Sequence, residues 1–481
     1  MFEASHSRVL CEIANHAVAT PDKVALVAGA RRVTYSRLAA GITDAACLLQ
    51  GMGVKRGDRI VLMARKEVEF VYLYFAAHLL GAVNVVVDPA APADRLEHII
   101  KTVNPKASFT TAGISPENLD LARFDGGQPD LPQVAADDVA DVMFTTGTTG
   151  MPKGVCLTHA NIAGSAANIN GFIGTNADDV EALGLPLSHS FGLGRLRCVL
   201  MAGGTMVLVG SFANLKAFFA AIEFEHVTGF GMVPAVWQYI KRLSGRRIGK
   251  FAGQLRYIEI GSAALPLEDK RLLMELFPNT RLCVHYGLTE ASRALFCELH
   301  DCTDDLETIG RPASALVEAC VLDESGHEVP DGTDGELCVR GNMVTRSYFL
   351  PRDNEGAFFG DWFRTGDWVH RSAGGNFYLT GRKKEMINVG GEKVSPAAIE
   401  DAIKSLGVTD CACVAVLDPN GMLGEVPKAY LVQGGTPLSF EDIKGRLAQL
   451  LPQHEIPVQW EWIDSIPRSS SGKIQRLKLK Q

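Results

Sequence analysis

A loop rich in hydroxyl groups is the first segment of this sequence that could do chemistry. Residues 144–154 read FTTGTTGMPKG and hold four threonines and three glycines. Glycines let the backbone approach a ligand closely, and amides, hydroxyls and a lysine can surround phosphate oxygens. The loop is not a Walker A motif, which needs Gly before the lysine and Ser or Thr after it. It predicts a phosphate site, with a flexible surface turn as the alternative, and its candidate ligands are Thr145, Thr146, Gly147, Thr148, Thr149, Gly150 and Lys153.

The order of residues in this loop resembles the signature of the adenylate-forming (AMP-binding) superfamily. That superfamily includes acyl- and aryl-CoA ligases, nonribosomal adenylation domains and luciferases, and its loop ends in Pro-Lys-Gly. The departure is Thr146, where many members have Ser. Further motifs follow in the superfamily's own order and cover nearly the whole chain. The resemblance implies ATP and Mg²⁺ as cofactors, with Thr145 and Glu290 at the metal.

The segment 285–290, HYGLTE, directly follows a predicted strand, where parallel sheets place their ligands. A tyrosine offers a π-face to a base, a threonine donates a hydrogen bond, and a glutamate is a hard oxygen ligand. In the superfamily these residues meet adenine, the α-phosphate and Mg²⁺. The resemblance therefore implies a nucleotide site that includes His285, Tyr286, Gly287, Thr289 and Glu290.

Three more matches extend the nucleotide site. The turn 261–266, GSAALP, resembles the superfamily's Gly-Gly-Ala-Pro-Leu turn and adds Gly261, Ser262 and Ala263. By the same resemblance, Asp367 and Arg382 contact the ribose. A carboxylate can accept from both ribose hydroxyls, which agrees with the role of Asp367.

The last part of the chain matches the superfamily's moving domain. Lys384 matches its hinge, and Gly391 matches a glycine that lines the pantetheine tunnel after rotation, with a plain turn glycine as the alternative. Lys473, within SSSGKIQR, matches the catalytic lysine. A cation between the substrate carboxylate and the α-phosphate lowers their repulsion and stabilises the in-line transition state.

The acyl substrate is the least determined feature. His189 matches the gate histidine of many CoA ligases, and no acidic residue stands beside it to pair an α-ammonium, which argues against amino acids. Arg293 could pair a second carboxylate, although a surface arginine is the commoner outcome. An apolar pocket favours an aromatic acid first and a fatty acid second. By position, its candidate residues are Ser190, Phe191, Gly231, Met232 and Leu288, beside Gly261.

The resemblance implies two half-reactions. A carboxylate attacks Mg·ATP to give an acyl-adenylate and pyrophosphate. Rotation at Lys384 then withdraws Lys473, brings in Gly391, and lets a thiol displace AMP. Coenzyme A is the expected thiol, with the phosphopantetheine of an acyl carrier protein as the alternative. A luciferase-type oxidase and a silent nucleotide binder are the competing classes.

Patterning predicts an α/β fold with a large N-terminal body, residues 1–383, and a small mobile α+β domain, residues 384–481. Short β-branched runs alternate with helical ones through residue 285, which indicates parallel-rich sheets flanked by helices. Glu69–Leu80 is expected to be an amphipathic helix and 267–276 another helix. An antiparallel segment follows residue 315. In the small domain, strands are expected over 411–417, 428–432 and 458–463, and helices over 397–406 and 440–451.

Composition bounds the remaining possibilities. The 481 residues carry a net charge of −8, which argues against a nucleic-acid binder with a broad basic face. The 11 cysteines lack paired spacing, and Cys411 and Cys413 alternate as core residues would. No signal peptide or membrane span is predicted, so a cytoplasmic protein, monomeric or homodimeric, is expected.

Overall fold

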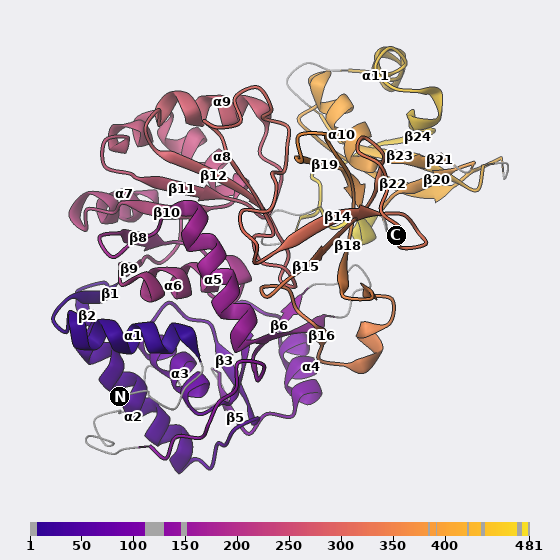
Figure 1. Cartoon of the computed structure of the whole chain (residues 1–481). Coiled ribbons are helices and arrows are strands. Elements are labelled where there is room, and N and C mark those ends of the chain that lie inside the picture. Colours follow the sequence, from indigo (N-terminus) through magenta and orange to yellow (C-terminus); the bar gives the residue numbers. More distant parts are fainter. Residues whose placement is uncertain are drawn as a thin grey trace. The chain divides into compact units, whose positions relative to one another are not determined.

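The computed structural model describes residues 7–110, 129–145, 152–382, 385–390, 392–420, 423–433, 438–468 and 474–479, without the side chains of Arg382, Glu392 and Lys393. The chain divides into two compact units. The first comprises residues 1–319 and 339–363, and the second comprises residues 320–338 and 364–481. Figure 1 traces the order of the elements. This division into compact units does not test the expected mobile domain that begins at residue 384, so that boundary stays a prediction.

An eight-stranded sheet carries most of the first unit. Its order is β13-β12-β11-β10-β8-β9-β1-β2, and the six strands from β12 to β1 are parallel, with an antiparallel strand at each edge. The strands are β1 Val24–Ala28, β2 Arg31–Thr34, β8 Val180–Leu183, β9 Thr205–Leu208, β10 Gly229–Met232, β11 Tyr257–Ile260, β12 Arg281–Tyr286 and β13 Leu295–Glu298.

A six-stranded sheet follows the order β16-β7-β6-β4-β3-β5. Its strands β5, β3, β4 and β6 are parallel, whereas β7 and β16 add antiparallel pairs. Pairing of β6 with β7 brings Thr145 opposite Lys153, so the two ends of the phosphate loop are neighbours. The strands are β3 Arg59–Met63, β4 Val83–Val87, β5 Ala107–Phe109, β6 Val139–Thr145, β7 Lys153–Thr158 and β16 Ser347–Tyr348.

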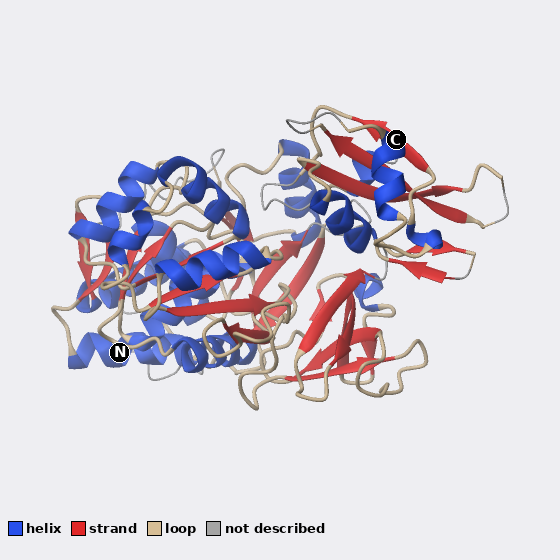
Figure 2. Ribbon diagram, turned by 90° about the horizontal axis from the view of Figure 1, so that it is seen from above, coloured by secondary structure: helices blue, strands red, loops and turns tan. Residues whose placement is uncertain are grey.

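Helices cover these sheets, as Figures 1 and 2 show. One hydrophobic cluster joins strands of both sheets to α1, α2, α3 and α6. Threonine caps begin two of the helices: Thr34 accepts from the backbone of Arg37, and Thr158 forms a capping box with Asn161. The helices are α1 Arg8–Ala19, α2 Tyr35–Gly51, α3 Val68–Leu79, α4 Ala93–Val103, α5 His159–Ile173, α6 Ser190–Ala202, α7 Leu215–Phe224, α8 Pro234–Ser244 and α9 Leu267–Leu276.

The helix α3 corrects the prediction of an amphipathic helix. All of its residues except Glu69 are buried. A helix that is apolar all round belongs in a core rather than at a surface, and α3 packs within the cluster that both sheets share. The sequence VEFVYLYFAAHL already lacks a polar stripe, so the interpretation as amphipathic was wrong.

Lys66 links the ends of strands from both sheets. It follows β3, and its Nζ donates to the carbonyls of Gly184 at 2.6 Å, Val209 at 3.1 Å and Gly210 at 2.7 Å, beyond β8 and β9. Burial lowers the pKa of Lys66 to about 8. Lys66 therefore connects the carboxyl end of β3 in one sheet to the carboxyl ends of β8 and β9 in the other.

The second unit contains antiparallel strands and a small α/β layer. In a five-stranded sheet, β18 (Trp362–Arg371) pairs antiparallel with β17 (Phe358–Phe359) and β19 (Phe377–Arg382), which confirms the antiparallel segment. The sheet also includes β14 Glu318–Leu322 and β15 Gly335–Arg340, and the division between the units falls within it.

Towards the C-terminus, the sheet β22-β23-β24 packs with two helices. Its strand β22 buries Cys411 and Cys413, as their alternation predicted. Helix α11 is shorter than the predicted helix 440–451, since its last residue is Leu447. The elements are β20 Ile387–Val389, β21 Glu392–Val394, α10 Pro396–Ser405, β22 Asp410–Leu417, β23 Glu425–Val432, α11 Phe440–Leu447 and β24 Gln459–Trp462. Among the described residues, no helix has the length and hydropathy to cross a membrane.

A buried histidine at the start of α5 makes the first unit sensitive to acid. Neither ring nitrogen of His159 has a hydrogen-bond partner among the described residues, and burial lowers its pKa to about 3, well below the usual value near 6.5. The unfolded chain binds this proton below pH 6.5 and the folded chain does not. The free energy of unfolding therefore falls as the pH is lowered from 6.5 towards 3.

We expect His159→Leu to flatten the acid side of the stability profile, because an apolar side chain has no proton to gain. Urea unfolding at pH 7, 6 and 5 measures this effect. The surface substitution His327→Leu controls for the loss of a histidine as such. Parallel profiles for wild type and His159→Leu would show that His159 takes up its proton without unfolding.

Candidate active site

Predicted residues of the first unit gather at the carboxyl ends of the parallel strands in the eight-stranded sheet. The strands β8, β10, β11 and β12 are parallel neighbours, so their carboxyl ends lie together. Gly231 and Met232 end β10, Gly261 follows β11, and residues 287–290 follow β12. His189 and Ser190 begin α6, which follows β8. Segments far apart in sequence thus meet where a parallel sheet binds ligands.

Two of these glycines are required by close packing. A Cβ on Gly261 would lie 2.1 Å from Nε2 of His285, and one on Gly231 would lie 3.0 Å from the ring of Phe191. The rings of Phe191 and His285 are themselves 4.7 Å apart, edge to face. Phe191, Gly231, Gly261 and His285 therefore form one packed surface.

The predicted phosphate and metal residues share a tyrosine that sequence reasoning missed. The hydroxyl of Tyr348, on β16, donates to Oε1 of Glu290 at 2.7 Å. Its ring lies 5.1 Å from Nζ of Lys153, which is also 3.6 Å from Asp353. Burial and the neighbouring Glu290 raise the pKa of Tyr348, so its hydroxyl stays protonated and keeps donating.

This arrangement fits a magnesium ion. Oε1 of Glu290 accepts from Tyr348, which orients the carboxylate. A carboxylate oxygen is a ligand that a hard cation takes. Glu290 and Thr145 are the residues that the resemblance predicts to hold Mg²⁺.

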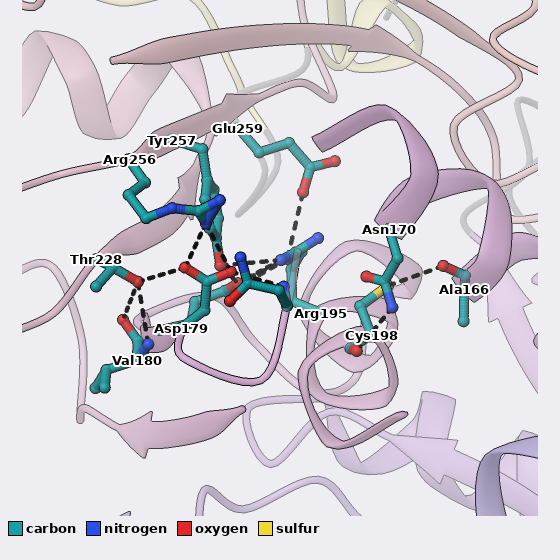
Figure 3. Close-up of polar contacts among 12 residues, drawn as sticks. Ala166, Asn170, Asp179, Val180, Arg195, Cys198, Thr228, Arg256, Tyr257 and Glu259 are labelled. Atoms are coloured by element: carbon teal, nitrogen blue, oxygen red, sulfur yellow. Dashed lines mark hydrogen bonds and ion pairs between the residues drawn. The ribbon is translucent and has the colours of Figure 1, made fainter. Parts of the chain in front are cut away.

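Beneath the packed surface lies a buried charge network formed by Glu181, Arg195, Tyr257, Glu259, His285 and Arg293. Nε of Arg293 donates to Glu259 at 3.0 Å, and Nδ1 of His285 lies 2.9 Å from the same Oε1. Arg195 reaches from α6 towards Glu259, at 3.6 Å, and pairs with Glu181. Figure 3 shows Arg195 between Glu259 and Tyr257.

Arg293 corrects both interpretations made from the sequence. It is neither at the surface nor open to a second carboxylate. Its Nη1 donates to the carbonyl of Ser190 and to Oγ of Ser292, both at 3.0 Å, and its Nη2 donates to the carbonyl of Phe191 at 2.9 Å. An arginine three residues after Glu290 carries no local pattern that signals burial, so only the fold reveals these partners.

Burial and charged neighbours shift the pKa values of Glu259 and His285 in this network. Burial acts to raise the pKa of Glu259, but Arg293 and His285 outweigh it and hold this pKa well below its usual range. Burial also lowers the pKa of His285, which is therefore neutral at physiological pH. Nδ1 of His285 lies 2.9 Å from Oε1 of Glu259, and its Nε2 faces Gly261.

Backbone strain is present at the same edge. Ser262 and Arg293 have φ values of 74° and 58°, a left-handed region that side chains other than glycine adopt at a cost. The superfamily's turn has Gly where this chain has Ser262, which agrees with the backbone conformation found there.

His189, the predicted gate histidine, has an acidic neighbour in the fold, although the sequence places no acidic residue beside it. Asp88, the residue after β4, lies 3.9 Å from Nε2 of His189 and accepts from Oγ of Ser188 at 3.3 Å. The contact joins the six-stranded sheet to the loop before α6, and no sequence signal linked these residues.

In the second unit, strand pairing places the backbone of Asp367 opposite that of Arg382 across β18 and β19, and Asp367 is buried.

The described residues on either side of Lys473 make contacts within the second unit. The backbones of Arg468 and Ile474 form an isolated antiparallel β-bridge. Arg476 donates to Glu385 at 2.8 Å and pairs with Glu400. Arg476, which sequence reasoning missed, thus joins the residue after the predicted hinge to the catalytic-lysine segment.

Several predicted residues lie outside the described residues. They are Thr146, Gly147, Thr148, Thr149, Gly150, Lys384, Gly391 and Lys473, together with the side chain of Arg382. Their roles stay predictions.

Comparison with known proteins identifies the family. The sequence model for "AMP-binding enzyme" matches residues 13–349. The chain therefore belongs to the family of AMP-binding enzymes.

Its relatives are acid–CoA ligases. Feruloyl-CoA synthase from Amycolatopsis sp is 29% identical over 95% of both chains. Salicylyl-CoA synthase / salicylate adenylyltransferase from Streptomyces sp is 31% identical, over 95% of this chain and 90% of that protein. o-Succinylbenzoate CoA synthetase from Bacillus subtilis, solved with its acyl-adenylate, is 25% identical with a TM-score of 0.87, over 98% of both chains. The same enzyme has been solved with ATP and magnesium ion, at a TM-score of 0.86.

The chain is thus an AMP-forming acid–CoA ligase, which activates a carboxylic acid with ATP and Mg²⁺ and forms a thioester with coenzyme A. The predicted α/β fold with its antiparallel segment is confirmed.

We expect Tyr348→Phe to raise the Mg²⁺ concentration for half-maximal pyrophosphate release by about 10-fold or more, because a metal ligand that loses its supporting hydrogen bond is poorly oriented. A magnesium titration at saturating ATP and acid measures this effect. Tyr239→Phe, which removes a half-exposed hydroxyl that bonds the Ala213 carbonyl, is the control. An unchanged titration with Tyr348→Phe would exclude the supporting role.

Proposed function

We propose that the enzyme activates an aromatic monocarboxylic acid and transfers its acyl group to coenzyme A. The observation that carries the proposal is an apolar surface at the carboxyl ends of β8, β10 and β11, together with a polar group at Glu290, which follows β12 and which Tyr348 connects to Lys153 of the second sheet. Phe191, Gly231 and Met232 form the apolar part, and Lys153 and Glu290 belong to the polar part. An acid needs both, because its acyl group is apolar and its activation involves phosphate and metal.

The proposed residue roles follow this division. Thr145–Lys153 hold the leaving phosphates, Thr289 the α-phosphate and Glu290 the metal. Tyr286 stacks on adenine, and His285, Gly287, Gly261, Ser262 and Ala263 line the same nucleotide site. Asp367 and Arg382 bind the ribose, His189 gates the acyl site, and Lys473 stabilises the reacting oxygens.

The charge state of the acyl group follows from the buried network. Arg195 and Arg293 are the described cations that lie beneath the apolar surface, and both are already paired. A second carboxylate on the acyl group would be buried without a partner, which costs free energy. We therefore propose an uncharged aromatic group; the feruloyl and salicylyl relatives support its aromatic character. A fatty acid is the second candidate.

The substrate class can be tested by pyrophosphate release across benzoates, cinnamates, fatty acids and amino acids, with and without coenzyme A. We expect turnover with an uncharged aromatic acid, and about 10-fold or greater preference for cinnamate over 4-carboxycinnamate. Sustained turnover only with an acyl carrier protein would favour the alternative acceptor. Equal rates for the two cinnamates would contradict the uncharged acyl group.

The proposed alternation predicts that two substitutions separate the half-reactions. Lys473→Ala should abolish adenylate formation yet leave thioester formation from synthetic acyl-adenylate largely intact, because the lysine serves the first transition state only. Gly391→Leu should do the reverse by blocking the pantetheine path. Rapid-quench assays of each half-reaction measure both, and equal loss of the two by Lys473→Ala would overturn its assignment.

A further inference from the structure

We propose that Arg293 is a positioning residue that fixes the first turn of α6, and with it the Phe191 ring, so that the acyl group is selected by shape. The inference rests on the proposed function, since it concerns the acyl site of the same enzyme. It assigns to a buried arginine a role in substrate selection.

The first argument is the set of atoms that the guanidinium holds. Its two Nη atoms donate to the carbonyls of Ser190 and Phe191, the first two residues of α6. Carbonyls within a helix usually accept from the helix alone. An external donor on two consecutive ones ties this turn to the segment after β12.

The second argument is the contact with Phe191 itself. The guanidinium carbon of Arg293 lies 4.5 Å from the centre of the Phe191 ring, and His285 meets that ring edge to face. Glu259 holds both Arg293 and His285. The ring of Phe191 is thus supported by two side chains that one carboxylate orients.

The third argument is how closely Arg293 packs against the helix. A Cβ on Gly194 would lie 2.6 Å from Nη1 of Arg293. The guanidinium therefore occupies space that a side chain on the next turn of α6 would need. Gly194→Ala can displace Arg293 without changing any charge.

The variants are chosen to separate positioning from stability. Arg293→Lys keeps the charge but loses the planar donor set, and Glu259→Gln with Arg293→Met removes a charge-balanced pair. Asp269→Asn with Lys241→Met is the matched control, because it removes a buried carboxylate and the cation paired with it on α9 and α8, in a pair that includes no residue of α6.

Kinetics provide the first measurement. We expect Arg293→Lys, Gly194→Ala and the Glu259/Arg293 pair to raise the KM of the preferred acid about tenfold, with the KM of ATP changed less than about twofold. The preference for that acid over its next larger homologue should fall. The control pair should lower the melting temperature without this selective change. A parallel rise in both KM values, or the same rise in the control, would overturn the proposal.

Hydrogen exchange provides a measurement that does not depend on the substrate. In the ligand-free protein, amides of the first two turns of α6 should exchange about tenfold faster in the Arg293 and Gly194 variants than in wild type, and no faster in the control pair. Unchanged exchange would refute the positioning role even if an aromatic acid is the substrate. Absence of wild-type activity on any aromatic acid would instead refute the proposed function.

Discussion

The ion pair between Glu259 and Arg293 is the interaction on which the active-site edge depends. Both side chains are buried, and each satisfies groups from separate elements: Glu259 binds Arg293 and His285, while Arg293 binds the first turn of α6. Removing one member of such a pair leaves an unpaired charge in the interior, at a cost of about 3–5 kcal/mol. The pair therefore joins β11, β12 and α6 into one rigid support for ligands.

The sheets around this pair explain why charges can be buried there at all. Parallel strands covered by helices on both faces leave no room for water, so polar groups in the layer must pair with one another. A second cluster follows the same rule in the six-stranded sheet, where Asp141 accepts from Tyr74 at 2.8 Å and pairs with Arg197. Burial acts to raise the pKa of Asp141, but Arg197 and His78 lower it to about 2. Both arginine partners, Arg195 and Arg197, come from α6, so this helix links the two sheets electrostatically.

The division of labour between the two units follows from the chemistry. Binding of phosphate, metal and acyl group requires a preorganised surface, and the proposed roles assign this surface to Lys153, Glu290, Tyr348 and Phe191 of the first unit. Two half-reactions at one centre require different groups in turn, which is the physical reason for the proposed alternation. In the second unit, Arg476 ties the segment around Lys473 to Glu385 and Glu400. The segment that follows Lys473 and the residue after the predicted hinge are therefore connected by ion pairs.

The sequence by itself determined the features that depend on local order. Alternating β and α patterns gave the parallel sheets, because burial on both faces demands continuous apolar strands. The loop 144–154 and the segment HYGLTE predicted phosphate and nucleotide sites, because such sites are built from backbone and neighbouring hydroxyls. Tertiary structure alone decided which long-range partners the charged residues have. Tyr348 beside Glu290, Asp88 beside His189, and Arg293 beneath Phe191 join segments 58 to 102 residues apart, and no local pattern encodes such contacts. Arg293 shows the reason most clearly, since its burial depends on Glu259 and on two carbonyls that only the assembled sheet and helix bring within reach.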